Sequence, residues 1–145
     1  MRVLVQRCEQ AWVTSEGIEV GRIGTGLCCL VGITHTDSEA LVDKMADKLR
    51  HLRIFDDADG VMNLSADETD ASFLVVSQFT LYGDARKGRR PSWTQAARPE
   101  VAEPLVERLI EQLRTEGATV ETGRFRTDMQ VGLINDGPAT ILIEL

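Results

Sequence analysis

The sequence lacks any hydrophobic run long enough to span a bilayer. Its longest apolar stretch covers residues 27–33, whereas a transmembrane helix needs roughly 20 apolar residues. Proline is scarce, with 4 among 145 residues, and 12 glycines with 43% hydrophobic content fit neither a collagen-like nor a disordered chain. A secretory signal is also missing, because Arg7 and Glu9 interrupt the apolar region that it needs. We therefore expect a single cytoplasmic domain over residues 1–145 that has no membrane contact.

Cysteine is rare as well. Of the 3 cysteines, Cys28 and Cys29 are neighbours on a predicted strand, so their side chains point to opposite faces and resist binding one metal ion. The spacings HExxH and CxxC are absent. We expect Cys8, Cys28 and Cys29 to be small buried hydrophobic residues, and we expect no metal and no cofactor. A catalytic cysteine remains the alternative, with His35 or His51 as its base.

The charge is acidic overall but basic in one segment. A net charge of -7 argues against a protein that coats nucleic acid by neutralising phosphates. Five of the 16 basic residues nevertheless lie between Asp84 and Arg98, where Asp84 is the only acidic residue. This segment is either a local site for an anionic ligand or an ordinary solvated loop.

The first half of the chain predicts strands, a helix and a further strand. Residues 2–14 and 18–23 form a predicted β-hairpin, and residues 27–33 add a buried third strand, all antiparallel. The T-x-x-E pattern at residues 36–39 predicts a capping box for a helix that runs to about Arg50. Residues 73–76 predict an apolar strand.

The second half predicts one helix and two short strands. An apolar stripe from Val101 onwards predicts a helix that ends at Gly117. Pro99 suits its first turn, and at Pro104, which lacks an N–H, the helix either begins or bends. Residues 130–135 and 139–145 predict two short strands. The order of elements indicates an α+β fold: curved antiparallel or mixed β-sheets, barrel-like, covered by two main helices in a single domain.

Two short motifs contain groups suited to a binding cleft. The segment SQFTL at residues 77–81 places two hydroxyls and an amide where a buried strand ends. The segment NDGPAT at residues 135–140 contains a Gly-Pro pair, whose carbonyls can be held in a fixed direction. Either motif alone would fit an ordinary strand end or turn.

Together with three further segments, these motifs resemble the D-aminoacyl-tRNA deacylase family. The further segments are VGRIGTGL from Val20, RIFDDADGVMNLS from Arg53 and RKGRRPSW from Arg86. The resemblance spans nearly the whole chain. It implies an enzyme that hydrolyses the ester bond of D-aminoacyl-tRNA, and of mischarged glycyl-tRNA, and so proofreads chirality in translation.

The resemblance also implies partners and an arrangement of the site. The substrate would be the 3′ end of a tRNA carrying a D-amino acid. The protein would be a homodimer with active sites shared across the interface, in which a cis Gly137-Pro138 pair enters the partner's pocket and rejects L-amino acids with its carbonyl groups.

Site residues are carried over by position in the matching motifs. Ser77, Gln78, Phe79 and Thr80 would form the catalytic pocket, where backbone N–H groups stabilise the developing oxyanion. The substrate-binding residues would be Gly137, Pro138, Thr140, Met129, near the adenosine, and Arg7, which supports the Gly-Pro loop. Whether Thr80 attacks the ester or positions the substrate stays open.

The chain departs from the family pattern beside the adenosine pocket. Relatives usually read FGA where this chain has Phe125, Arg126 and Thr127, so larger side chains alter that edge. Two alternative functions are a synthetase-type editing domain acting on L-seryl-tRNA and a non-catalytic module that binds tRNA ends. The pairing of SQ-x-TL with Gly-Pro favours D-aminoacyl substrates over both.

Overall fold

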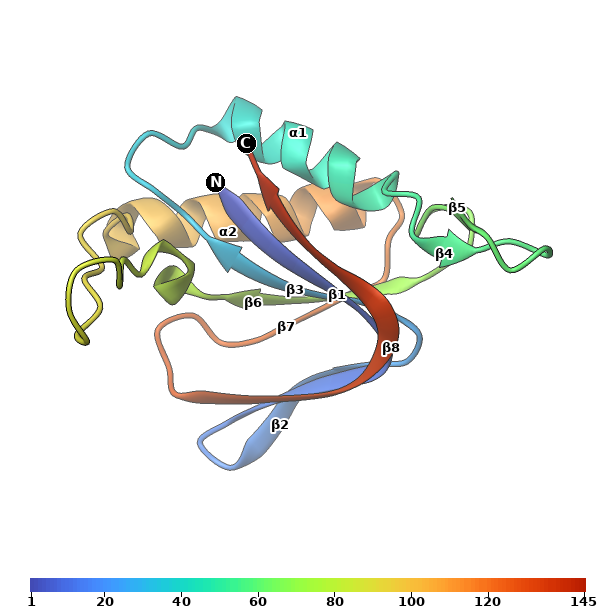
Figure 1. Ribbon diagram of the computed structural model, residues 1–145, viewed down its shortest axis with the longest axis horizontal. Coiled ribbons are helices and arrows are strands. Elements are labelled where there is room, and N and C mark those ends of the chain that lie inside the picture. The colour runs from blue at the N-terminus through green and yellow to red at the C-terminus, as the bar shows by residue number, and fades with distance from the viewer.

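The computed structural model describes residues 1–145, and two helices cover one side of a strongly curved sheet (Figure 1). The helices are α1 Glu39–Arg50 and α2 Pro99–Thr115. The strands are β1 Arg2–Ser15, β2 Ile18–Ile23, β3 Gly26–Gly32, β4 Phe55–Asp56, β5 Met62–Leu64, β6 Ser72–Ser77, β7 Val120–Thr122 and β8 Met129–Glu144. Neither helix is long and apolar enough to cross a membrane.

One mixed sheet contains every strand except the small hairpin β4–β5. β1 pairs antiparallel with β3 through its first half, with β2 through its second half, and with β8 along its whole length. β6 lies parallel between β3 and β7. The predicted antiparallel start of the sheet and the α+β, barrel-like class are confirmed.

Glycine allows the sheet to curve towards closure. A Cβ on Gly21 of β2 would lie 2.8 Å from the carbonyl oxygen of Thr122 on β7. Real side chains do not tolerate this distance to a backbone atom, so only glycine lets β2 approach β7 so closely. β8 curves around the other side of β1, and its second edge pairs with no strand (Figure 1).

The two faces of the sheet build two separate cores. A cluster of 24 buried residues, which includes Cys29, fills the space between the sheet and the helices. A cluster of seven, which includes Cys8 and Cys28, fills the inside of the curved sheet. The predicted alternation of Cys28 and Cys29 is therefore confirmed, and all three cysteines are buried and free.

Helix α1 begins later than the predicted capping box. Its N-cap residue is Ser38, whose side chain makes no capping hydrogen bond. The preceding turn is held instead by Asp37, whose carboxylate accepts the Thr34 N–H at 2.8 Å and the Met1 ammonium at 2.6 Å. Because these contacts fix residues 34–37 as a turn, the capping box at residues 36–39 was wrong.

Helix α2 begins at Pro99 and continues through Pro104. Proline fits the first turn of a helix, where its missing N–H would have no partner. Past the C-terminus of the helix, Gly117 adopts a φ of 96° and donates its N–H to the Arg114 carbonyl at 2.9 Å. The predicted end at Gly117 and the predicted place of Pro99 in the first turn are confirmed, whereas a start at Pro104 is wrong.

The C-terminal segment differs from the two predicted short strands. Residues 129–144 form the single strand β8, which pairs with β1 on both sides of an irregular stretch. Residues 120–122, which no sequence pattern predicted, form β7 and add a parallel edge to β6. Three residues are too few for a periodic signal, so β7 depends on its neighbours.

Candidate functional site

The first predicted motif lies where β6 ends at the edge of the helical layer. Ser77 is the last residue of β6, and the Gln78 N–H donates to the Val31 carbonyl of β3 at 2.7 Å. The chain then forms a 3₁₀ turn over Phe79–Tyr82. Gly32 permits this turn to pack against β3, since a Cβ there would lie 3.1 Å from the Leu81 Cβ.

The beginning of this 3₁₀ turn presents backbone donors. The first hydrogen bond of the turn runs from the Leu81 N–H to the Gln78 carbonyl at 3.2 Å, so the N–H groups of Phe79 and Thr80 have no acceptor within the turn, as is usual for the first donors of a helix. The Thr80 hydroxyl, in contrast, accepts a hydrogen bond from Gln78 Nε2 at 2.5 Å. The motif therefore presents two adjacent N–H donors and a hydroxyl oriented by an amide.

A cavity of about 640 Å³ opens beside this turn. Four sequence-predicted residues line it, namely Ser77, Gln78, Phe79 and Met129. Thr80 does not line the cavity, although it belongs to the same turn. The other lining residues come from the ends of β3 and β6, from the segment before α2, from α2 itself and from the segment before β8.

The aromatic side chains of Phe79 and Trp93 lie at the cavity. Phe79 is 56% exposed, and its ring centroid lies 6.2 Å from that of Trp93 in a tilted arrangement. Both residues line the cavity. Exposed aromatic rings offer stacking surfaces for nucleic-acid bases.

The cavity contains little that could serve as a side-chain base. Its lining includes neither histidine nor cysteine, and Asp128 is its only carboxylate. The His35 ring lies outside, with Nε2 3.0 Å from the Thr94 carbonyl oxygen. Burial raises the pKa of Cys28 to about 12, so this thiol is protonated at neutral pH. No group of three His, Cys, Asp or Glu side chains suited to a metal ion is present.

The second predicted motif lies on a bulge of β8. Gln6 of β1 pairs with Thr140, and Cys8 pairs with Asn135, so residues 136–139 of β8 all lie opposite Arg7. The bulge contains the Gly137-Pro138 peptide bond, which is cis. Gly137 and Pro138 are both exposed.

The buried side chain of Arg7 binds this bulge. Its Nε donates to the Asp136 carbonyl at 3.2 Å and lies 2.9 Å from Asp136 Oδ2. Its Nη1 donates to the Ile54 carbonyl and lies 3.3 Å from Asp56 Oδ1 of β4. One guanidinium thereby links the bulge to the hairpin β4–β5, as its fixed fork of donors allows.

Gln6 closes the bulge at its base. Its Nε2 donates to the Asn135 side-chain oxygen, and its Oε1 accepts the Thr140 hydroxyl at 3.0 Å. Thr140 therefore stabilises the motif from within the chain.

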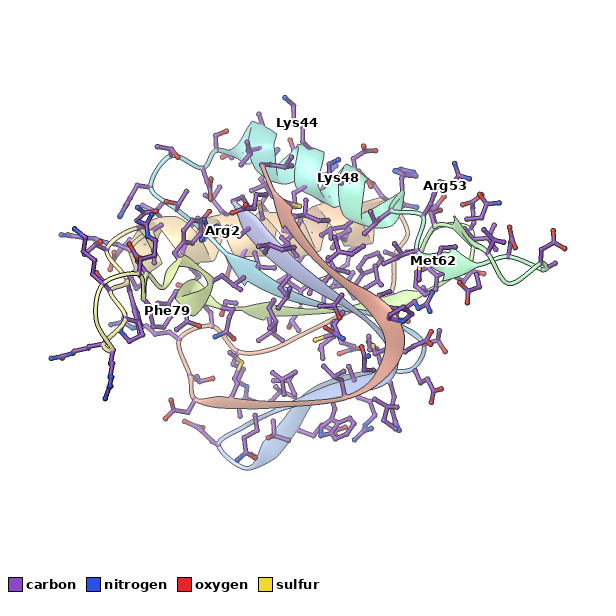
Figure 2. All side chains as sticks on the ribbon, viewed as in Figure 1. Arg2, Lys44, Lys48, Arg53, Met62 and Phe79 are labelled. Carbon is purple, nitrogen blue, oxygen red and sulfur yellow. The ribbon has the colours of Figure 1, made fainter.

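The two groups of predicted residues lie far apart within one chain. Arg7, Gly137, Pro138 and Thr140 do not line the cavity. Figure 2 shows Phe79, at the cavity, and Met62, on the hairpin that Arg7 contacts, at opposite ends of the molecule. One chain alone does not bring the Gly-Pro pair to its own cavity.

Comparisons with known proteins show the family of this chain. The family model described as D-Tyr-tRNA(Tyr) deacylase matches residues 4–144. The chain belongs to this deacylase family. It is similar to the D-aminoacyl-tRNA deacylases of Brevibacillus brevis, at 56% identity over 99% of both chains, and of Symbiobacterium thermophilum, at 54% identity over 99% of this chain and 95% of the other. The solved structure of the c-Myc DNA Unwinding Element Binding Protein is also similar, with a TM-score of 0.94, 36% identity, and coverage of 100% of this chain and 99% of the other.

This deacylase-family chain has an unusual backbone at the cavity edge formed by Phe125, Arg126 and Thr127. Arg126 adopts a φ of 60°, a left-handed conformation that glycine accommodates more easily. Thr127 anchors the turn, because its hydroxyl donates to the Arg124 carbonyl at 3.0 Å and accepts the Ser15 hydroxyl at 2.8 Å. Arg126 lines the cavity, and its guanidinium has no partner in the chain.

Two walls of the cavity had no clear signal in the sequence. Trp93 and Val106 line it, but Val106 was part of an ordinary apolar stripe and Trp93 followed a run of basic residues. The aromatic residue next to that basic run was the only local signal. The remaining walls arise because α2 packs beside β6, which a local pattern does not reveal.

Proposed function

We propose that this protein hydrolyses the ester bond of D-aminoacyl-tRNA and releases the free D-amino acid and the tRNA. Membership of the deacylase family supports the reaction class. The observation that carries the chemistry is the start of the 3₁₀ turn beside the cavity: Phe79 lines the cavity, Thr80 directly follows it, and the N–H groups of both residues have no acceptor within the turn. Backbone donors in this position are suited to a developing oxyanion.

The mechanism needs little from side chains. An aminoacyl ester is already activated, so a cavity that orients it beside water and stabilises the tetrahedral oxyanion lowers the barrier without a nucleophile from the protein. Water attacks the carbonyl carbon, the charge that develops on the carbonyl oxygen is stabilised by the two N–H groups, and the 3′ oxygen of the terminal ribose leaves with a proton. This proposal agrees with a lining that contains no histidine.

We further propose that the selecting element comes from a second copy of the chain. The support is that Gly137 and Pro138 are exposed on a bulge that does not line the chain's own cavity. β8 also has an unpaired edge, and Val131, Ile134 and Leu142 on this strand are 36%, 44% and 51% exposed. Unpaired strand edges with apolar side chains favour association.

In such a homodimer, the carbonyl groups of Gly137 and Pro138 enter the partner's cavity and exclude a side chain of L-configuration. Glycine has no side chain, so mischarged glycyl-tRNA is also a substrate under this proposal. Met129 lines the same cavity as Phe79 and would contact the adenosine. Charged tRNA is the substrate, so we place the enzyme in the cytoplasm.

The deciding experiment compares one tRNA charged with the D- and the L-form of the same amino acid. Ester loss is followed in both, with glycyl-tRNA and L-seryl-tRNA as further substrates. We expect hydrolysis of the D-aminoacyl-tRNA and of glycyl-tRNA, while the L-aminoacyl-tRNA remains intact. Binding without hydrolysis would indicate a tRNA-end binding module, and hydrolysis of L-seryl-tRNA alone would indicate an editing domain.

A further inference from the structure

The strongest concentration of unpaired positive charge lies in the loop between Asp84 and Ser92. We name residues 85–91 the basic loop. Two backbone hydrogen bonds close it, from the Asp84 N–H to the Ser92 carbonyl at 2.7 Å and from the Ser92 N–H to the Asp84 carbonyl at 2.9 Å. Gly88, with a φ of 78°, supplies a turn within it. These hydrogen bonds therefore fix both ends of the basic loop.

One basic residue of the loop is used internally. Arg86 contacts the Asp84 carboxylate through Nε at 2.9 Å and Nη2 at 2.7 Å, and these hydrogen bonds lower the pKa of Asp84 to about 2. The only acidic residue near the loop is thereby paired. Lys87, Arg89 and Arg90 are exposed and make no hydrogen bond or ion pair with the chain.

The segment that follows the loop fixes its place beside the cavity. The Thr34 hydroxyl donates to the Gln95 carbonyl at 2.6 Å, and the Ala97 N–H donates to the Ile33 carbonyl at 2.9 Å. These contacts attach the segment to the end of β3. Trp93, directly after the loop, faces Phe79 at the cavity.

A further unpaired guanidinium connects the loop region to the cavity. Arg98 lines the cavity, is exposed and has no side-chain partner. The yellow segment at the left of Figure 1 shows this region projecting beyond the sheet, next to the first turn of α2. A strand of nucleic acid that leaves the cavity on this side lies next to the positive charges of Arg98 and the basic loop.

A neighbouring cavity is lined by more acidic than basic side chains. This cavity of about 620 Å³ shares Ser77, Val106 and Phe125 with the first. It is lined by three glutamates of α2, Glu103, Glu107 and Glu111, and by two arginines, Arg114 and Arg124. Phosphates are repelled by carboxylates and attracted by guanidinium groups, so this mixed lining is less favourable for an RNA strand than the side with the basic loop and Arg98, where the Asp84 carboxylate is paired with Arg86.

We propose that the basic loop and Arg98 bind the phosphodiester backbone of the RNA whose 3′ end occupies the cavity. This inference rests on the proposed function, because it assumes that the cavity takes the end of a charged tRNA. The contacts neutralise phosphates and read no base, so they give affinity that depends on salt and not on sequence. The acidic remainder of the chain keeps the RNA on this one surface.

The test compares two double variants that lose the same positive charge. Arg89→Ala/Arg90→Ala removes two loop cations. Lys44→Ala/Lys48→Ala removes two exposed lysines of α1, which Figure 2 shows on the side of the molecule away from Phe79. For each we measure kcat/KM with D-aminoacyl-tRNA and with the 3′-D-aminoacyl ester of adenosine, which has no phosphate.

We expect the loop variant to lose about tenfold in kcat/KM on D-aminoacyl-tRNA at 50 mM salt, because each lost phosphate contact lowers the logarithmic salt slope by about 0.7–0.9. The loss should shrink as salt rises to 200 mM. Hydrolysis of the adenosine ester should change less than twofold in the loop variant, and the lysine variant should match the wild type on both substrates.

Direct binding separates this inference from the proposed function. The affinity of each variant for uncharged tRNA is measured by fluorescence anisotropy across the same salt range. A wild type that binds tRNA through the loop but hydrolyses neither ester would overturn the proposed function and support the loop. A loop variant with wild-type affinity and wild-type salt slope, or a lysine variant with an equal loss, would overturn the inference.

Discussion

Arg7 contacts Asp136 twice, once at the backbone carbonyl, 3.2 Å from Nε, and once at the side chain, where Oδ2 lies 2.9 Å from the same nitrogen. The arginine is buried at the base of the bulge, while Gly137 and Pro138 directly above are exposed. The position of the exposed pair thus depends on a guanidinium that solvent hardly reaches.

The first prediction concerns that guanidinium. Arg7→Lys keeps the charge but loses the forked set of donors, so it cannot hold both the bulge and the Ile54 carbonyl. We expect kcat/KM for D-aminoacyl-tRNA to fall roughly tenfold and hydrolysis of L-aminoacyl-tRNA to rise above the wild-type level, because small displacements of positioning groups have effects of this order or larger.

Arg50→Lys provides the control. Arg50 is also largely buried and links two segments, through Asp67 and through Glu116 at 3.2 Å, but it contacts neither the bulge nor the cavity. This variant should leave the ratio of D- to L-hydrolysis unchanged. An Arg7→Lys enzyme with wild-type discrimination would show that the bulge is held by other contacts.

The second prediction separates backbone from side-chain catalysis. If water attacks the ester, Thr80→Ala and Ser77→Ala lose only positioning, on the order of tenfold to a hundredfold in single-turnover rate, whereas removal of a true nucleophile typically lowers the rate by about 10⁴-fold or more. Acid quench followed by mass spectrometry searches for an acyl-enzyme. An ester trapped on Thr80, with activity abolished in a folded Thr80→Ala variant, would restore covalent catalysis.

The third prediction concerns assembly. If the Gly-Pro bulge completes the cavity of a second copy, active protein sediments at about twice 16.0 kDa. Activity should decline on dilution in parallel with dissociation, as measured by analytical ultracentrifugation and by initial rates at the same concentrations. Full D-specific activity in a monomer would contradict a shared site.

The fourth prediction uses the left-handed backbone at Arg126. Arg126→Gly removes the steric penalty of a positive φ but gives the unfolded chain more conformational freedom. Because the first effect is larger, we expect the free energy of unfolding to rise by roughly 0.5–1 kcal/mol. For a chain of this length we expect Tm to rise by about 1–4 °C, as measured by calorimetry. Arg124→Gly is the matched control, since Arg124 is exposed and has no positive φ; it should lower Tm or leave it unchanged.

The fifth prediction tests the cysteines. Burial raises the pKa of all three thiols, that of Cys28 to about 12, so the protonated form dominates through neutral pH and thiolate appears only as pH rises towards that range. We expect no alkylation by iodoacetamide at pH 8 in the folded protein and full alkylation after denaturation, followed by mass spectrometry. Rapid labelling of a cysteine in the native protein together with loss of activity would instead support a catalytic thiol.

The sequence predicted those elements whose pattern is local. The hairpin of β1 and β2, the buried strand β3 and helix α2 with its end at Gly117 follow from alternation, helical spacing and turn residues. β7 and the start of α1 were missed or misplaced because they depend on distant partners. β7 exists through its pairing with β6, and the turn before α1 is held by the ammonium of Met1, which is 36 residues from Asp37 in the sequence.

The candidate site shows the same limit. The SQFTL motif was identified by its residue types, and the structure brings its Ser77, Gln78 and Phe79 to one cavity with Met129. The N–H groups of Phe79 and Thr80 have no acceptor within the turn because the chain forms a 3₁₀ turn there, and the residue types do not predict this turn. The wall formed by Val106 of α2 arises from helix packing alone.

The bulge between Asn135 and Thr140 has a consequence for how this enzyme family can diversify. In a continuous strand, an insertion of one residue reverses which side chains face the core. Here the ladder is interrupted opposite Arg7 and resumes with its own pairing on each side. Residues can therefore be added or removed at positions 136–139 while both halves of β8 keep their inward and outward faces. The exposed Gly-Pro bulge can therefore change in length and shape independently of the sheet that supports it.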